Sequence, residues 1–191
     1  MNAKSLSHLF LSTLLLLLLL ISMGSGRTQA APTSVRINAG ATTSYTDNNG
    51  NAWLADQFVN GGTAYTNSST LSGSSPAPQV YHSERYGQSK SSFAYNIPVS
   101  NGSYTVNLDF AESYVTGPGQ RIFGVSINGT QVLTNFDIFA AAGGMNIPVA
   151  KTFSVAVTNG TLNINFLPGS IENPKVNGIE VVPGTLPLPV A

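Results

Sequence analysis

Apolar and polar residues alternate along four stretches of the chain, and a period of two is typical of β-strands with one buried face. The clearest stretch runs from Tyr104 to Phe110, where aromatic and aliphatic residues are separated by Thr, Asn and Asp. The same alternation recurs at 123–127, 153–157 and 162–166. Helical spacing is missing from every window of eleven or more residues, because Gly or Pro interrupts each candidate. The pattern predicts an all-β fold class.

Asn-Gly pairs lie between these stretches, at 101–102, 128–129 and 159–160. Both residues tolerate a positive φ, which makes the pair the strongest short signal for a two-residue β-hairpin turn. Three hairpins are therefore predicted, with Asn and Gly at positive φ in each. A sandwich of two sheets is the natural way for this many short antiparallel strands to bury their apolar faces.

The first thirty residues differ from the rest of the chain. Lys4 precedes an apolar run from Leu9 to Ile21, and small and polar residues follow as far as Ala30. This order predicts a secretory signal peptide at 1–30 that is cleaved near Ala30. The alternative is a membrane anchor that is never cleaved, but the apolar run is shorter than the roughly 20 residues that span a bilayer.

Residues 31–183 are predicted to form a single domain, since no internal repeat divides them. Two stretches within it are expected to be long loops, Gly61–Pro78 and Val115–Gln120. Loops at one end of a rigid sandwich are where binding residues usually lie. Residues 184–191 are rich in Pro and are predicted to form an extended tail.

Composition excludes several classes of protein. Only 8% of residues are charged, and eight Lys and Arg balance eight Asp and Glu, which excludes a basic nucleic-acid-binding protein. The chain has no Cys, so disulfides, zinc–thiolate sites and thiol nucleophiles are excluded. After signal cleavage we expect a mildly acidic protein without a membrane span. It would be secreted or extracytoplasmic, in a periplasm, at a cell surface or in a secretory pathway.

Candidates for catalysis and metal binding are few. His82 lies in a strand-like stretch and is the single His that a Ser-His-acid triad could use in the mature chain, and a lone His is more often structural. A glycosidase needs two carboxylates across the scissile bond, and solvation at the surface explains Asp109 and Glu112 better. The segment 47–50 resembles the start of a calcium loop, but a capped turn explains it better. We therefore expect no enzyme, no metal site and no cofactor.

Aromatic and amide side chains are more abundant than catalytic ones. Sugars present apolar C–H faces edged by hydroxyls, so a sugar site needs aromatic rings together with fixed polar groups. Tyrosines at loops or strand ends suit this chemistry, whereas those in alternating strands are expected to be sheet residues. The six tyrosines considered are Tyr65, Tyr81, Tyr86, Tyr95, Tyr104 and Tyr114.

A series of short motifs resembles the malectin domain, a carbohydrate-binding module, over roughly Ser34 to Val182. The resemblance implies a jelly-roll sandwich of the galactose-binding-like type that binds glucose-containing oligosaccharides, typically α-linked diglucosides, without metal. The motifs, in chain order, are Ile37-Asn38-Ala39-Gly40, Asp47-Asn48-Asn49-Gly50 with Trp53 and Asp56, Tyr81-His82-Ser83-Glu84-Arg85-Tyr86, Leu108-Asp109-Phe110-Ala111-Glu112-Ser113-Tyr114, Ile127-Asn128-Gly129, Phe136-Asp137-Ile138-Phe139 and Glu172-Asn173-Pro174-Lys175-Val176.

The resemblance also implies which residues bind sugar. Tyr65, Tyr86 and Tyr114 match the stacking tyrosines of the family, and Glu172 stands where the family usually has Asp before Asn-Pro-Lys. The animal members have a second aromatic directly after the third tyrosine, and Val115 stands there, which implies that part of the stacking surface is missing.

Glu84 and Arg85 are neighbours in a strand, so their side chains point to opposite faces. We expect a structural role for this pair, in which one of them points inward and holds the Phe110-Ala111-Glu112 strand end through a buried pair. Direct contact with sugar is the alternative.

These observations together predict a non-catalytic carbohydrate-binding protein whose ligand is an oligosaccharide or glycan, carried by a glycoprotein or a cell-wall polysaccharide. Nucleic acid and membrane are not expected partners. Two alternatives remain open: a module that recognises extracellular proteins or peptides on the same fold, and the accessory module of a glycoside hydrolase.

Overall fold

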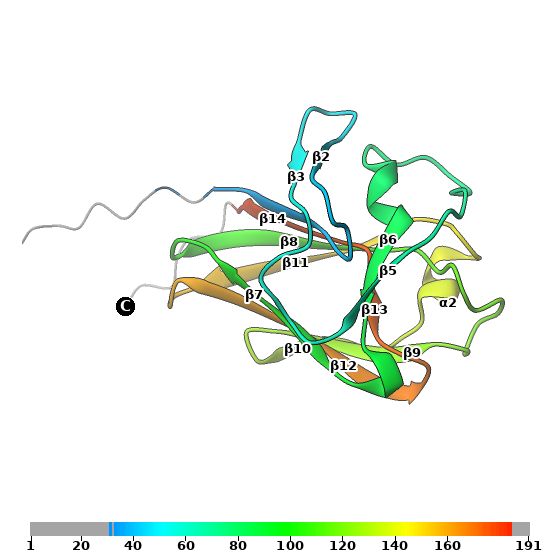
Figure 1. Ribbon diagram of the computed structural model, residues 1–191. Helices are drawn as coiled ribbons and strands as arrows, with labels where there is room; N and C mark the ends of the chain where they lie inside the picture. The colour runs from blue at the N-terminus through cyan, green and yellow to red at the C-terminus, as the bar shows by residue number, and fades with distance from the viewer. Residues whose placement is uncertain (1–30, 32, 185–191) are drawn as a thin grey trace, which may run out of the picture. The chain divides into compact units, whose positions relative to one another are not determined.

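The computed structural model describes residue 31 and residues 33–184, in which two β-sheets pack face to face (Figure 1). One sheet has the strand order β1-β14-β8-β11 and the other β10-β9-β12-β7-β4, and neighbouring strands in both are antiparallel. The chain crosses from one sheet to the other repeatedly, as in a jelly roll. The predicted all-β sandwich is confirmed.

The four-stranded sheet contains strands that are far apart in the sequence. Its members are β1 (Val35–Asn38), β8 (Gly102–Phe110), β11 (Val149–Val157) and β14 (Gly178–Pro183). The members of the five-stranded sheet are β4 (Val59–Asn60), β7 (Phe93–Pro98), β9 (Ile122–Ile127), β10 (Thr130–Phe136) and β12 (Thr161–Ile171).

The core lies between the sheets and is built from the alternating residues that the sequence analysis singled out. Along β8 the residues from Tyr104 to Phe110 that face inward are fully buried, and Asn107 and Asp109 between them face outward. Tyr95 is also fully buried, so it is a core residue, as expected, and not a binding residue. Stacked and edge-on aromatic rings fill the space between the sheets.

One of the three predicted hairpins is present, and the other two are wrong. Asn128 and Gly129 both have positive φ, at 48° and 80°, and join the paired strands β9 and β10. The pairs at 101–102 and 159–160 instead connect strands of opposite sheets, β7 to β8 and β11 to β12. An Asn-Gly pair favours a tight reversal of the chain, but the buried faces of the following strand decide which sheet it joins.

Short strands and helices lie outside the two main sheets. They are β2 (Tyr45–Thr46), β3 (Ala52–Trp53), β5 (Thr63–Thr66), β6 (Ser83–Tyr86), β13 (Lys175–Val176), the 3-10 helices η1 (Pro78–His82) and η2 (Gln88–Lys90), and α2 (Ile138–Ala142). Strands β13, β6 and β5 form a small sheet, so the segment Gly61–Pro78 is not entirely a loop as predicted. Val115–Gln120 is a loop.

The signal peptide expected at 1–30 and nearly all of the tail expected at 184–191 lie outside the described residues. The described residues belong to one compact unit that begins at Ala31. Within this part of the chain no helix is long and apolar enough to cross a membrane.

Candidate functional site

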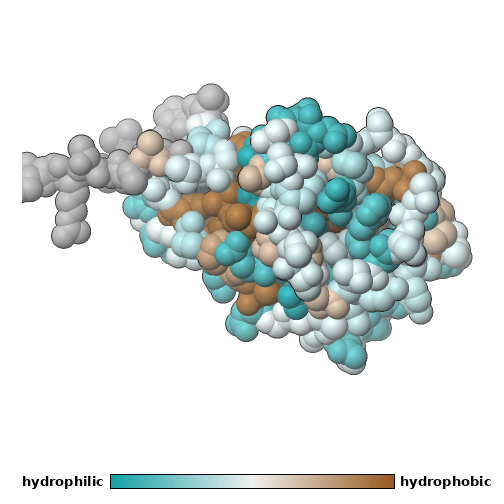
Figure 2. Space-filling view, turned by 45° about the horizontal axis from the view of Figure 1, so that its top comes forward, coloured by the Kyte–Doolittle hydropathy of each residue, from teal (hydrophilic) through white to brown (hydrophobic). Residues whose placement is uncertain are grey.

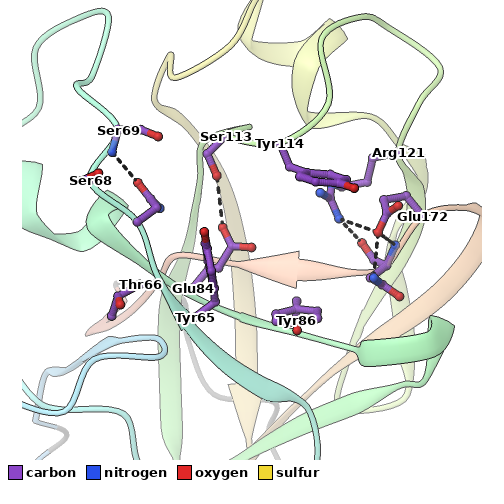
Figure 3. A pocket seen from close by; sticks show the side chains of 12 residues that line it. Tyr65, Thr66, Ser68, Ser69, Glu84, Tyr86, Ser113, Tyr114, Arg121 and Glu172 are labelled. Carbon is purple, nitrogen blue, oxygen red and sulfur yellow. Dashed lines mark hydrogen bonds and ion pairs between the residues drawn. The ribbon is translucent and has the colours of Figure 1, made fainter.

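The four predicted site residues line one cavity of about 530 Å³, which we call the tyrosine cavity. Tyr65 comes from β5, Tyr86 from the end of β6, Tyr114 from the loop after β8, and Glu172 from the residue after β12. In Figure 3 Tyr114 lies above an open space and Tyr86 below it, with Tyr65 to one side and Glu172 to the other. The complete lining is Tyr65, Thr66, Asn67, Ser68, Ser69, Glu84, Tyr86, Ser113, Tyr114, Arg121, Glu172 and Asn173.

The aromatic rings of this cavity are accessible to a ligand. Tyr114 is 73% exposed and Tyr65 is 53% exposed, whereas Tyr86 is half-buried. Exposed rings of this size are uncommon, because burying them would stabilise the fold. A flat apolar ligand face that covers them would recover part of that stabilisation on binding.

Buried ion pairs hold the base of the tyrosine cavity. Arg121 donates to Glu112 from Nε at 2.6 Å and from Nη2 at 3.3 Å, and its Nη1 donates to the carbonyl oxygen of Asn173 at 2.6 Å. The same guanidinium lies 3.9 Å from Glu172. Glu112 is fully buried and accepts the backbone N–H of Tyr114 at 2.9 Å. This chain of contacts fixes the backbone from which the Tyr114 ring projects.

The pKa of Glu112 reflects this environment. Burial alone would raise it, but the hydrogen bond from Arg121, the positive charge of Lys175 and the backbone N–H of Tyr114 outweigh burial and hold the pKa below its ordinary value. Glu112 therefore stays ionised and paired, and it is not a proton donor for catalysis.

Glu84 has the structural role that the sequence analysis expected for one member of the Glu84-Arg85 pair. It forms an ion pair with the fully buried ammonium of Lys175, which also donates to the carbonyl oxygen of Ala111 at 2.8 Å. The pair therefore holds the end of β8, although Glu84 also lines the tyrosine cavity. Arg85 points elsewhere and pairs with Asp56 at 2.5 Å.

Three local expectations of the sequence analysis have a structural outcome. His82 is exposed at the end of η1 and not in a strand. Asp47 caps its own turn: its carboxylate accepts the N–H groups of Asn49 and Asn51, the Asn51 side-chain amide and the indole N–H of Trp53. Among the described residues no three His, Cys, Asp or Glu side chains are grouped so as to hold a metal ion.

Val115 is the residue that stands where the animal members have a second aromatic. Its side chain is buried and does not line the tyrosine cavity. A Phe there would have to enter the packed interior. The exposed ring of the preceding Tyr114 is the aromatic that this loop presents.

Sequence reasoning missed Arg121 and Lys175. Both are cations in a chain with few charges, but their partners lie 9 to 91 residues away in the sequence. The position of Lys175 in the Asn-Pro-Lys motif was a signal that it has a fixed role.

Fold and cavity together define a class of protein: an all-β sandwich with exposed aromatic rings and a carboxylate at one end, whose candidate catalytic carboxylates do not meet. Asp109 and Glu112 do not line a common cavity, because Glu112 is buried against Arg121. This is the architecture of a binding module.

A profile of the Malectin domain matches residues 33–179, and the chain belongs to this family. It is 33% identical to malectin of Homo sapiens over 127 residues, which cover 59% of this chain and 43% of that protein. It is 33% identical to malectin-B of Xenopus laevis over 126 residues, which cover 59% of this chain and 45% of that protein. The chain therefore spans less than half the length of these relatives.

Plant receptors include the same fold. A probable receptor-like protein kinase of Arabidopsis thaliana is 33% identical over 187 residues, covering 90% of this chain and 22% of that protein. The crystal structure of the plant receptor-like kinase FER matches with a TM-score of 0.67 and 28% identity, over 79% of this chain and 42% of that chain. The Arabidopsis ANX1 ectodomain matches with a TM-score of 0.69 and 19% identity, over 77% and 47%, which shows the fold alone.

Proposed function

We propose that this chain binds glucose-containing, α-linked oligosaccharides in the tyrosine cavity, with Tyr65, Tyr86 and Tyr114 stacking on sugar rings and Glu172 accepting hydroxyl hydrogen bonds. The observation that carries the proposal is the meeting of these four side chains, from four separate segments, around one cavity. Its volume of about 530 Å³ is within the range of small-molecule sites.

The charges around the cavity favour a neutral ligand. Arg121, which lines it, and Lys175, which pairs with the lining residue Glu84, are each engaged by a glutamate and a backbone carbonyl oxygen. A sugar carboxylate would find no uncompensated cation there and would lie near Glu84 and Glu172. Hydroxyl groups, in contrast, can donate to these carboxylates and accept from the Ser and Asn side chains of the lining.

The test is calorimetry with maltose, nigerose, cellobiose and glucuronic acid. We expect the two α-glucosides to bind at least tenfold more tightly than cellobiose, and glucuronic acid not to bind. Equal or reversed preference for cellobiose would reject the α-linked specificity, and binding of glucuronic acid alone would reject a neutral ligand.

Substitutions locate the site. A ring contact of some tens of Å² contributes roughly 1 to 2 kcal/mol at about 25 cal/mol per Å². Tyr86→Ala and Tyr114→Ala should therefore each weaken maltose binding about ten- to thirtyfold, with little change in melting temperature. Leu54→Ala is the matched control, because Leu54 is partly exposed and does not line the cavity. If Tyr86→Ala lowers only the melting temperature, the tyrosines are structural.

Recognition of an extracellular protein is the second candidate, favoured by the fold match to ectodomains of plant receptors. A binder of this kind would show no affinity for any glucoside in the calorimetry. The fold also matches part of Bacteroides uniformis β-glucuronidase 2, with a TM-score of 0.64 and 20% identity over 78% of this chain and 18% of that chain. The hydrolase-accessory alternative rests on the fold alone.

An extracytoplasmic location is proposed with this function. It rests on the leader-like sequence at 1–30 and is compatible with a surface whose polarity comes from Ser, Thr and Asn and not from charge. N-terminal sequencing of the exported protein should give Ala31 as the first residue.

A further inference from the structure

A second cavity of about 430 Å³ lies on the outer face of the four-stranded sheet and shares no lining residue with the tyrosine cavity. Outward-facing residues of β8, β11 and β14 form its floor, and the β2–β3 hairpin and η1 form its walls. We call it the Asp109 cavity. Figure 2 shows strongly hydrophilic residues gathered at the top of the view, over the turn of this hairpin.

One carboxylate of the floor, that of Asp109, has only small residues as its neighbours on the adjacent strands. In the strand register Asp109 of β8 lies between Gly178 of β14 and Ala150 of β11, so no long side chain stands beside it. A Cβ atom at Gly178 would lie 3.1 Å from Asp109 Oδ2 and 3.1 Å from Cζ3 of Trp53. The same Cβ would lie 2.5 Å from Cγ1 of Val80, so glycine at this position lets Val80, the indole ring and the carboxylate pack closely over β14.

Aromatic rings form the walls beside this carboxylate. Trp53 and Tyr81 are both buried and line the cavity. The Tyr81 hydroxyl donates to Asp109 Oδ1 over a long 3.4 Å, the one side-chain hydrogen bond to this carboxylate among the described residues. Much of the hydrogen-bonding capacity of Asp109 is thus free to meet a ligand.

The other two carboxylates of the lining are already satisfied. Asp47 accepts four hydrogen bonds within its own turn, and Glu180 pairs with Arg36 at 2.6 Å and accepts from Asn107 at 2.7 Å. No Lys or Arg is among the described residues that line this cavity. Asp109 is therefore a carboxylate in a protein hollow without a cation.

We propose that the Asp109 cavity binds an organic cation, the ammonium or guanidinium group of a Lys or Arg side chain from a peptide partner. The cation would lie against Asp109, beside the buried Trp53 and Tyr81, where the carboxylate neutralises it. Amides of Asn49 and Asn51 and the Ser75 hydroxyl, which also line the cavity, can bind the peptide main chain. A neutral sugar would leave the charge of Asp109 uncompensated.

The ionisation of Asp109 gives the site a pH signature. Burial, and next the nearby charge of Glu180, raise the pKa of Asp109 to about 7. The other titratable or charged groups that face it are Asp47 and Tyr45 beside the hairpin, Tyr81 of η1, and Arg36, which Glu180 engages. If the ionised form binds the cation, affinity should rise about tenfold from pH 6 to pH 8, because the ionised fraction rises from about one tenth to nine tenths.

The experiment compares two peptides that differ in charge, acetyl-Gly-Lys-Gly-amide and its norleucine analogue, by calorimetry on the full chain at pH 6 and pH 8. We expect the Lys peptide to bind and the norleucine peptide to bind at least tenfold more weakly. Equal affinity of the two peptides, no binding of the Lys peptide, or an affinity that falls with pH would overturn the proposal.

Two matched variants separate this cavity from the tyrosine cavity. Asp109→Asn keeps the shape of the side chain and should weaken Lys-peptide binding at pH 8 at least tenfold. Glu172→Gln makes the same change in the other cavity and should leave peptide binding unchanged. Unchanged binding in Asp109→Asn, or displacement of the peptide by maltose, would refute the site, whatever the outcome of the sugar experiments.

Discussion

Arg121 is the side chain whose loss should affect both the stability of the fold and the geometry of the tyrosine cavity. Its side chain is 4% exposed, and it donates to Glu112 and to the carbonyl oxygen of Asn173. Arg121→Met keeps much of the side-chain volume and removes the charge. The Glu112 carboxylate is then left buried without the guanidinium, and the carbonyl oxygen loses its donor.

The size of the effect follows from burial. Breaking a buried ion pair by removing one partner costs about 3–5 kcal/mol. In a domain of this length each kcal/mol lowers the melting temperature by about 2–4 °C, so Arg121→Met should melt roughly 6–20 °C lower. Arg36→Met is the matched control, because Arg36 and Glu180 form an equally short pair whose side chains are 17% and 23% exposed. Because water reaches this part-buried pair, it should contribute less to stability than the buried Arg121 pair.

Urea unfolding and thermal melting of the two variants at pH 7 measure the difference. Arg121→Met should also weaken maltose binding, because Glu112 holds the backbone N–H of Tyr114. Equal losses of unfolding free energy in the two variants would refute the reasoning that burial makes the Arg121 pair decisive. A large loss of stability with unchanged maltose affinity would refute its role in positioning Tyr114.

Two further predictions concern the turn and the buried acid. Gly129→Val should lower the free energy of unfolding by roughly 1 kcal/mol or more, because Gly129 has a φ of 80° that a β-branched residue rarely adopts. Gly117→Val is the control and should lower it by less, because Gly117 does not have a positive φ. Equal losses of unfolding free energy in urea would contradict this prediction. Asp109→Asn should stabilise the fold at pH 8, by at most about 4 kcal/mol, and not at pH 4. The folded pKa of about 7 exceeds the unfolded value, so stability falls as pH rises from about 4 to 7 and stays lowered above it. Equal effects at both pH values would show that ionisation of Asp109 does not destabilise the fold.

The strands could be predicted from the sequence because burial of one face leaves a period of two. Their partners could not be predicted from the turns between them. Gly160 has a positive φ, as Gly129 does, but β11 and β12 join opposite sheets. Whether a turn makes a hairpin or crosses the sandwich depends on which face of the next strand is apolar relative to the whole core, and a local pattern does not contain that information.

Tyr86 and Tyr114 of the tyrosine cavity could be proposed from motifs, because they end the strings from Tyr81 to Tyr86 and from Leu108 to Tyr114. Tyr65 lies in none of these strings and was proposed from its position in the first long loop. The ion pairs at the base of the cavity could not be predicted from the sequence, because Lys175 and its partner Glu84 are 91 residues apart in the chain. The Asp109 cavity was also missed. Asp109 lies between the small residues Gly178 and Ala150, and that relation appears only when the register of β8 with β14 and β11 is known.

The two cavities differ in how their charges are compensated, and this difference argues for separate ligands. In the tyrosine cavity Glu84 and Glu112 each have a buried cation, so the exposed rings determine what binds. In the Asp109 cavity the rings are buried and one carboxylate lacks a cation, so charge determines what binds. A neutral sugar would gain little affinity from the carboxylate of the Asp109 cavity. A cation would meet carboxylates that are already paired at the base of the tyrosine cavity. We therefore expect each ligand to bind in the presence of the other.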